Sequence, residues 1–243
     1  MEAMGLGLCR YLRERRIAER MTRSELATKA GVSVSTLKSI EAGKFPSYDV
    51  IPGLFEALKV PPAYWDHIMD LTQPRFIQRF MGALPTVPFP LDLVDLHSHK
   101  YPAALLTQPD QELIAVTAEY EEAFPGLRAG MNGLEWMWTD PRAAIVMPDL
   151  VRNRHLSTFA LRTMGQGIVD DFVLNRIYQT CRTNPDFEET WNTEVKPEDF
   201  YRETLVLRDF KTGRERTMVF KTERPEIPLR RWYMWRLVPI PEN

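Results

Sequence analysis

The sequence contains little cysteine and no long apolar run. Only Cys9 and Cys181 occur among 243 residues, and two isolated cysteines do not form a disulfide framework or a zinc site. No stretch reaches the roughly eighteen consecutive apolar residues of a transmembrane helix. Arginines follow only a brief apolar stretch at the N-terminus, which is not the layout of a signal peptide. We therefore expect a cytoplasmic protein without a membrane partner.

Histidine is also scarce. Asp95, His97 and His99 follow an Asp-x-His-x-His pattern, which resembles the metal-binding opening of amidohydrolase-type barrels and could share a divalent metal. Such barrels need further distant histidines and carboxylates on about 250 residues, and this chain has only His67 and His155 besides. The surrounding prolines indicate an extended connector instead. We expect neither a metal nor a cofactor.

No catalytic constellation is recognisable in the sequence. Ser157 and Cys181 are single candidate nucleophiles without a plausible base and orienting acid. The composition, with 44% apolar and 26% charged residues, is typical of a folded globular protein. We expect a protein that is not an enzyme.

The charge of the chain is distributed unevenly. The formal net charge is −2, but basic residues outnumber acidic ones in residues 1–45, and acidic residues outnumber basic ones in residues 103–199. A basic segment is the electrostatic feature that nucleic-acid-binding regions share. The distribution suggests two regions with different tasks.

Two short helical patterns flank a turn in residues 21–44. Thr22 and Glu25 have the spacing of a capping box. Gly31 ends the first helix, because glycine adopts the left-handed conformation at low cost, and Ser33 caps the second. These signals predict a helix-turn-helix. A further helix is expected before the motif, from Leu6 to Ile17. Two more are expected after it, one capped by Ser47 and one opened by Pro61-Pro62.

This stretch resembles the lambda-repressor-like (XRE) family. The residues that carry the resemblance are Thr22, Glu25-Leu26-Ala27, Gly31-Val32-Ser33, Ile40-Glu41 and Gly43. The resemblance implies a five-helix domain over residues 1–72 that binds a double-stranded DNA operator as a homodimer.

In this docking geometry the second helix of the motif lies in the major groove. Val34, Ser35, Lys38 and Ser39 would project toward the bases, where hydroxyl groups, an ammonium and an apolar contact can read base edges. Phosphate contacts from other positions would set the register. The residues expected to contact DNA are Arg23, Ser33, Val34, Ser35, Lys38, Ser39, Lys44 and Ser47.

A second domain is expected over residues 103–243, after a connector at 73–102. "PAALLT" and "QELIAVT" read as a strand hairpin, a short helix and two longer helices follow, and "RETLVLRDF", "RERTMVFKT" and "RRWYMWRLVP" close the chain as strands. Strand alternation places Trp235 inside beside Leu207 and Phe220, and Trp232 on the opposite face, where its loss would cost less. Five strands with helices inserted between the second and third predict a PAS-like α+β domain with an antiparallel sheet.

This half resembles the ligand-binding domain of MmyB-like (MltR-type) regulators. The resemblance rests on "PAALL", "ELIAVTAEYEEAF", "MNGLEWMWTDP", "VRNRHLSTFALR" and "FEETW", which occur in this order. It implies a PAS-like pocket for a fatty acid or another apolar small molecule. Apolar residues that could line it are Trp136, Trp138, Met147, Phe159, Met164, Phe172, Tyr178, Trp191 and Trp235. Arg154, Arg162 or Arg231 could each meet a carboxylate head group.

The sequence as a whole predicts a one-component transcription regulator whose C-terminal domain binds an apolar effector and modulates operator binding. The alternative is a DNA-tethered protein-interaction module with an acidic C-terminal domain and no small-molecule ligand.

Overall fold

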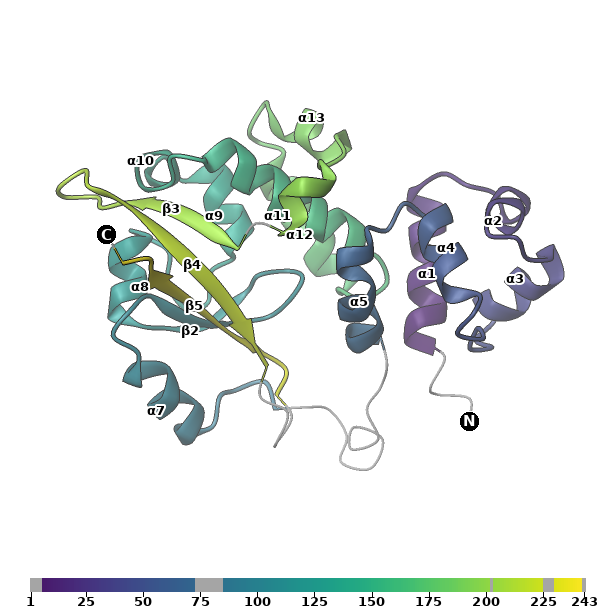
Figure 1. Cartoon of the computed structure of the whole chain (residues 1–243), viewed down its shortest axis with the longest axis horizontal. Coiled ribbons are helices and arrows are strands. Elements are labelled where there is room, and N and C mark those ends of the chain that lie inside the picture. Colours follow the sequence, from purple (N-terminus) through teal and green to yellow (C-terminus); the bar gives the residue numbers. More distant parts are fainter. Residues whose placement is uncertain (1–5, 73–84, 202, 225–229, 242–243) are drawn as a thin grey trace. The chain divides into compact units, whose positions relative to one another are not determined.

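The computed structural model describes residues 6–72, 85–201, 203–224 and 230–241. The chain divides into two compact units. Figure 1 shows the whole chain. The first unit comprises Met1–Gly82 and Ala160–Leu174, and the second comprises Ala83–Phe159 and Asn175–Asn243. Residues 73–84 of the expected connector lie outside the described residues.

The first unit is helical, as expected. Its elements up to Thr72 are α1 (Leu6–Ala18), α2 (Arg23–Lys29), α3 (Val34–Glu41), α4 (Ile51–Ala57), the 3-10 helix η1 (Pro62–Tyr64) and α5 (Trp65–Thr72). Their inward faces form one core around Leu12, Leu26, Leu37 and Phe55, all with no exposed area. Met164, from the segment that returns to this unit, belongs to the same core.

The predicted turn signals are present in the first unit. The Thr22 amide donates to Glu25 Oε2 at 2.7 Å and the Glu25 amide donates to Thr22 Oγ1 at 3.2 Å, which completes the capping box. Gly31 has φ +67, the conformation that only glycine adopts cheaply. The Thr36 amide donates to Ser33 Oγ at 2.9 Å. The helix-turn-helix was therefore readable from local signals.

The predicted cap at Ser47 was wrong. Helix α4 begins at Ile51 after Val50, and no side chain caps it. The Val50 amide instead donates to the Ser47 carbonyl at 3.0 Å, so a turn precedes the helix. Pro52 then occupies the first turn of α4, where a missing amide proton costs nothing.

The second unit contains a five-stranded antiparallel sheet with the order β2-β1-β5-β4-β3. The strands are β1 (Ala103–Leu106), β2 (Leu113–Val116), β3 (Thr204–Arg208), β4 (Glu215–Glu223) and β5 (Tyr233–Pro239). Between β2 and β3 the chain forms α8 (Ala118–Ala123), α9 (Gly133–Thr139), α10 (Arg142–Val146), α11 (Leu150–Met164), α12 (Asp171–Cys181), α13 (Phe187–Asn192) and η2 (Pro197–Tyr201). The predicted strand order along the chain and the inserted helices are confirmed.

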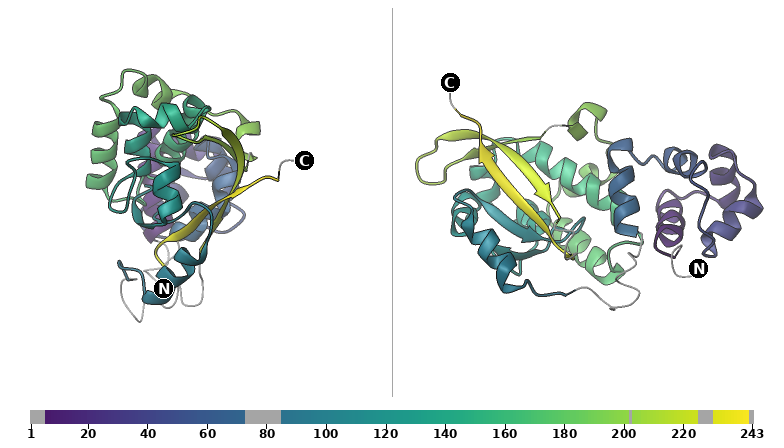
Figure 2. Two further views of the ribbon diagram at one scale, coloured as in Figure 1. Left: turned by 90° about the vertical axis from the view of Figure 1, so that its left-hand side faces the viewer. Right: turned by 60° about the horizontal axis from the view of Figure 1, so that its bottom comes forward.

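Both faces of the sheet are covered along β5. Trp235 packs on one side with Tyr120 of α8 and with Phe220 of β4. Met234 and Trp232 pack on the other side with Leu96, because side chains alternate along a strand. The left view of Figure 2 shows the teal and green helices that follow β2 on one side of the yellow-green strands.

The structure confirms that Trp232 faces the opposite side of the sheet from Trp235. The expectation that replacing Trp232 costs less stability was wrong, because Trp232 is the more deeply buried of the two. Trp232 has no exposed area, whereas Trp235 is only half-buried. The reason is that α7 (Pro90–Ser98) covers this face through Leu96.

Helix α7 also corrects the interpretation of residues 90–98 as an extended connector. Pro90 lies at the start of the helix, where its fixed φ favours helical geometry. His99 Nε2 lies 3.9 Å from Asp95 Oδ1. Across the described residues, no three His, Cys, Asp or Glu side chains gather as metal ligands would.

Candidate nucleic-acid interface

Helix α3 presents a polar face to solvent. Leu37 and Ile40 are buried, while the residues between and before them are exposed. The exposed residues on α3 are Val34, Ser35, Thr36, Lys38 and Ser39. All four predicted base-reading residues are thus exposed together on one short helix. Thr36 shares this exposure and was not among the residues singled out from the sequence.

The serine hydroxyls differ in their local roles. Ser33 Oγ accepts from the Thr36 amide and lies 2.8 Å from Ser35 Oγ. Ser39 Oγ donates to the Ser35 carbonyl at 3.1 Å. Ser33 Oγ therefore caps α3 and also lies beside the Ser35 hydroxyl.

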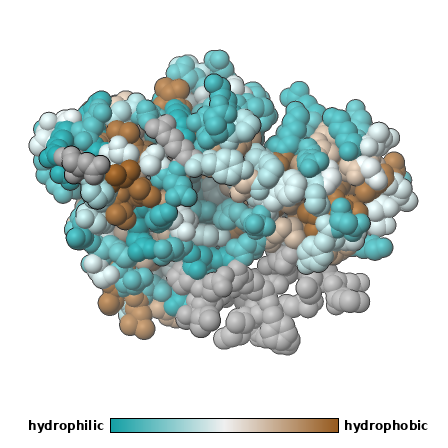
Figure 3. Space-filling model, viewed as in Figure 1, coloured by the Kyte–Doolittle hydropathy of each residue, from teal (hydrophilic) through white to brown (hydrophobic). Residues whose placement is uncertain are grey.

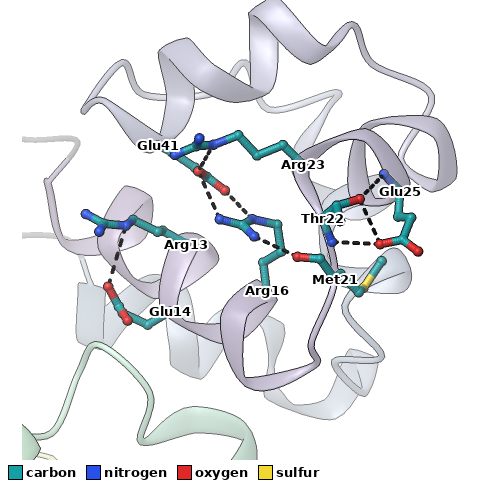
Figure 4. Close-up of polar contacts among 8 residues, drawn as sticks. All are labelled: Arg13, Glu14, Arg16, Met21, Thr22, Arg23, Glu25 and Glu41. Carbon is teal, nitrogen blue, oxygen red and sulfur yellow. Dashed lines mark hydrogen bonds and ion pairs between the residues drawn. The ribbon is translucent and has the colours of Figure 1, made fainter.

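Glu41, at the end of α3, joins the three helices around the motif (Figure 4). Arg16 Nε of α1 contacts Glu41 Oε1 at 2.6 Å, and Arg23 Nε of α2 contacts Glu41 Oε2 at 2.6 Å. Arg16 Nη1 also donates to the Met21 carbonyl at 2.6 Å. Only 2% of the Glu41 side chain is exposed. One carboxylate thus fixes the mutual placement of α1, α2 and α3.

The pKa of Glu41 reflects two opposing effects. Burial raises it, but the hydrogen bonds from Arg16 and Arg23, with their charges, outweigh burial and hold the pKa below its usual range. The sequence analysis named Glu41 among the residues that carry the family resemblance but assigned it no role. The available signal was a single acidic side chain closing the recognition helix within a basic segment.

The predicted phosphate-contacting residues are accessible. Arg23 is the first residue of α2 and its side chain is 46% exposed despite its bond to Glu41. Lys44 and Ser47 are exposed in the segment after α3. Helix starts and cations favour anions, so these positions can approach a phosphate backbone.

The predicted ligand-lining residues of the second unit fall in separate aromatic clusters. Trp138, Tyr178 and Trp191 surround the buried Phe187, with ring centroids 5.1, 5.5 and 5.6 Å away. Trp136 and Trp235 instead meet at Phe124, at 5.9 and 6.1 Å.

The remaining candidates are placed differently again. Met147 is buried, and Phe159 is buried against Phe200, with ring centroids 5.5 Å apart. Met164 belongs to the core of the first unit, and Phe172 is 77% exposed.

One candidate cation lies beside the first cluster. The Arg154 guanidinium lies 4.7 Å from the Trp138 ring centroid, and its Nε donates to the Met137 carbonyl at 2.8 Å. Burial lowers the pKa of Arg154. Arg231 is exposed, and the Arg162 carbonyl accepts from Arg15 Nη1. The Arg154 guanidinium thus lies against an aromatic side chain of the predicted lining.

Comparison with known families matches part of the first unit. Residues 12–65 match a family model described as "Helix-turn-helix". This match supports an XRE-type, DNA-binding transcription regulator and covers α2, α3 and α4 completely. A search of curated proteins finds no match to the chain. Within the described residues, no helix combines the length and apolar character needed to cross a bilayer.

Proposed function

We propose that the protein is a one-component regulator that inserts α3 into the major groove of an operator and changes its affinity when the second unit binds an apolar small molecule. The observation that carries the DNA-binding part is the exposed face of α3 inside the region matched as a helix-turn-helix. Ser35, Lys38 and Ser39 read base edges, and Val34 contacts a thymine methyl.

The protein binds DNA as a homodimer in this proposal. A single recognition helix contacts only a few base pairs, and helix-turn-helix proteins gain length of site by pairing two half-sites about one helical turn apart. Arg23, Lys44 and Ser47 hold phosphates and orient α3 without reading sequence.

Selection from a randomised duplex library with the full chain tests the DNA-binding proposal. The enriched duplexes should contain a palindrome, and Lys38→Ala with Ser35→Ala should relax base preference at the contacted positions, at a cost of about 1 to 3 kcal/mol in binding free energy. Arg23→Ala should weaken all sequences alike and reduce the salt slope by about one unit. Arg13→Ala is the matched control, because Arg13 is a half-exposed residue of α1 that lies 3.8 Å from its neighbour Glu14. Equal effects of Lys38→Ala and Arg13→Ala on base preference would refute the assignment of α3.

The effector in this proposal is a fatty acid or a similar apolar molecule. Support comes from the aromatic side chains that cluster around Phe187 and Phe124, and from Arg154 beside Trp138. Mass spectrometry of the denatured, purified protein should detect a co-purified amphiphile, and an Arg154→Met variant should carry less of a carboxylate-bearing one.

A specific surface favours the alternative of a protein-interaction module. Leu91 and Val94 of α7 are 78% and 66% exposed, and Val87 before the helix is 72% exposed. Figure 3 shows apolar surface over α7. Exposed apolar patches of this kind often mark interfaces. If no small molecule co-purifies and no fatty acid raises the melting temperature, this surface becomes the better explanation of the second unit.

A further inference from the structure

The segment Ala160–Leu174 lies far along the chain but belongs to the first unit. It begins with the last turn of α11, whose carbonyl groups have no partner within the helix. Tyr11 Oη of α1 donates to the Thr163 carbonyl at 3.0 Å, and Arg15 Nη1 donates to the Arg162 carbonyl at 3.3 Å. A cation at a helix C-terminus also interacts favourably with the helix dipole. Two side chains of α1 therefore cap α11.

The contact is buried and closely fitted. Tyr11 and Arg15 have no exposed area, and Met164 is only 6% exposed. Gly167 has φ +72, and a Cβ atom there would lie 3.0 Å from Tyr11 Cα. Glycine is therefore required twice over at this position, by its backbone conformation and by the close approach of α1.

Helix α1 continues this contact to the recognition helix. Arg16 follows Arg15 directly and binds Glu41 at the end of α3, and Glu41 in turn binds Arg23. Any change in the position or stability of α1 thus acts on both ends of the proposed DNA-contacting surface.

Helix α11 contributes residues to both units. Leu150–Phe159 belong to the second unit and Ala160–Met164 to the first. In the second unit, Trp138 Nε1 donates to Thr158 Oγ1 at 3.0 Å, and Thr158 has no exposed area. The same helix therefore has one buried polar attachment at Thr158 and two more at its C-terminal carbonyls.

We propose that α11 is the element through which the second unit regulates DNA binding: a change at Trp138 and Thr158 alters the capping of α11 by Tyr11 and Arg15, and α1 passes the change to Glu41 and α3. Coupling between sites is carried by packed side chains, hydrogen bonds and stiff helices. The inference rests on the proposed function for its biological meaning, but the coupling itself is measurable without DNA.

Hydrogen exchange of the full chain tests the coupling with a matched pair of variants. Thr158→Val removes a buried hydroxyl on α11. Thr117→Val removes one elsewhere in the second unit, where Thr117 Oγ1 accepts from the Ala103 amide at 3.2 Å. Thr158→Val should speed exchange in residues 160–174 and α1 about threefold to tenfold, the range expected for one lost hydrogen bond. Thr117→Val should leave both segments unchanged. Equal effects of the two variants, or no effect of Thr158→Val, overturn the proposal.

Tyr11→Phe approaches the same contact from the first unit. It removes the donor to the Thr163 carbonyl while keeping the ring that packs on Phe55. In the double variant with Thr158→Val, the change in hydrogen exchange of α1 should differ clearly from the sum of the changes in the two single variants. If Thr158→Val does not fold, Tyr11→Phe alone decides. The proposal requires that faster exchange extends from the C-terminal end of α11 toward its N-terminus, beyond Phe159. Faster exchange confined to the end near Met164 contradicts the proposal.

A DNA arm separates this inference from the proposed function. The probe is a duplex enriched by the wild-type chain from the randomised library. Thr158→Val should change its dissociation constant severalfold, and Thr117→Val should not. If the wild-type chain enriches no duplex, the proposed function fails, while the exchange measurements still decide whether α11 couples the units.

Discussion

At the scale of single residues, Glu41 determines the geometry of the first unit most directly. Its carboxylate accepts bonds from Arg16 and Arg23 while almost fully buried. The sequence predicted Arg23 as a phosphate contact but not its bond to Glu41, because pattern and charge do not show which distant carboxylate an arginine meets. Ser33 and Gly31 were predictable, since caps and left-handed turns depend on neighbours in the chain.

Replacing Glu41 should cost stability as well as binding. Glu41→Gln leaves Arg16 buried without a full counter-charge, and loss of one partner of a buried ion pair costs about 3 kcal/mol or more in the free energy of unfolding. Glu14→Gln is the control, because Glu14 lies 3.8 Å from the half-exposed Arg13 and a surface pair contributes about 1 kcal/mol at most. Urea unfolding of both variants measures the difference, and equal losses would show that Glu41 does not hold the motif.

The same carboxylate makes stability depend on pH. The pKa of Glu41 is lower in the folded state than its usual value of 4.5, so the folded state favours the charged form. The stabilisation is fully present above the unfolded pKa and is lost as pH falls through the folded pKa. The protection factors of amides in α1, α2 and α3, which correct for the pH dependence of intrinsic exchange, should decrease as the protein is acidified below about pH 4.5, and Glu41→Gln should weaken this dependence. An unchanged acid profile in the variant would argue against the assignment.

At the scale of elements, the strands and helices followed from local pattern, but the coverage of their faces did not. Alternation placed Trp232 and Trp235 on opposite sides of β5 correctly. The sequence did not reveal that α7 covers the Trp232 side, because its prolines suggested an extended chain. Arg230 strengthens this arrangement by binding Asp92 of α7 at 2.9 Å. Burial on each face is a tertiary property that periodicity alone does not determine.

The two tryptophans of β5 therefore have a revised order of importance. Trp232→Ala should cost about 3 to 5 kcal/mol in the free energy of unfolding, the range for truncating a fully buried large aromatic side chain. Trp235→Ala should cost less, because Trp235 is only half-buried. Chemical denaturation of the two variants compares them. A larger loss for Trp235→Ala would contradict the packing of α7 on β5.

At the scale of the whole molecule, each compact unit is built from two separate segments of the chain. The sequence predicted domains at 1–72 and 103–243, whereas the first unit also includes Ala160–Leu174. Residues such as Tyr11 and Thr163, which share a hydrogen bond, carry no sequence signal of that contact, since neither periodicity nor spacing relates residues so far apart. This is also why Met164 was expected beside a ligand and is found in the core around Leu12.

An apolar effector should stabilise the folded chain by mass action. A ligand present at a hundredfold excess over its dissociation constant adds about 2.7 kcal/mol to the free energy of unfolding. Thermal melts against a series of fatty acids measure this gain. The gain should decrease in Trp138→Ala relative to wild type and persist in Val151→Ala, whose side chain is 81% exposed. If no fatty acid of any chain length raised the melting temperature, the second unit would be better explained as a protein-interaction module.

Footprinting of the full chain on the duplex enriched from the randomised library tests the central claim most directly. The account predicts two protected major-groove segments on one face of the DNA, about one helical turn apart, with both protections weakened by Lys38→Ala together with Ser35→Ala. Protection without this spacing, or protection unchanged in the double variant, would contradict the claim that α3 is the element that reads DNA.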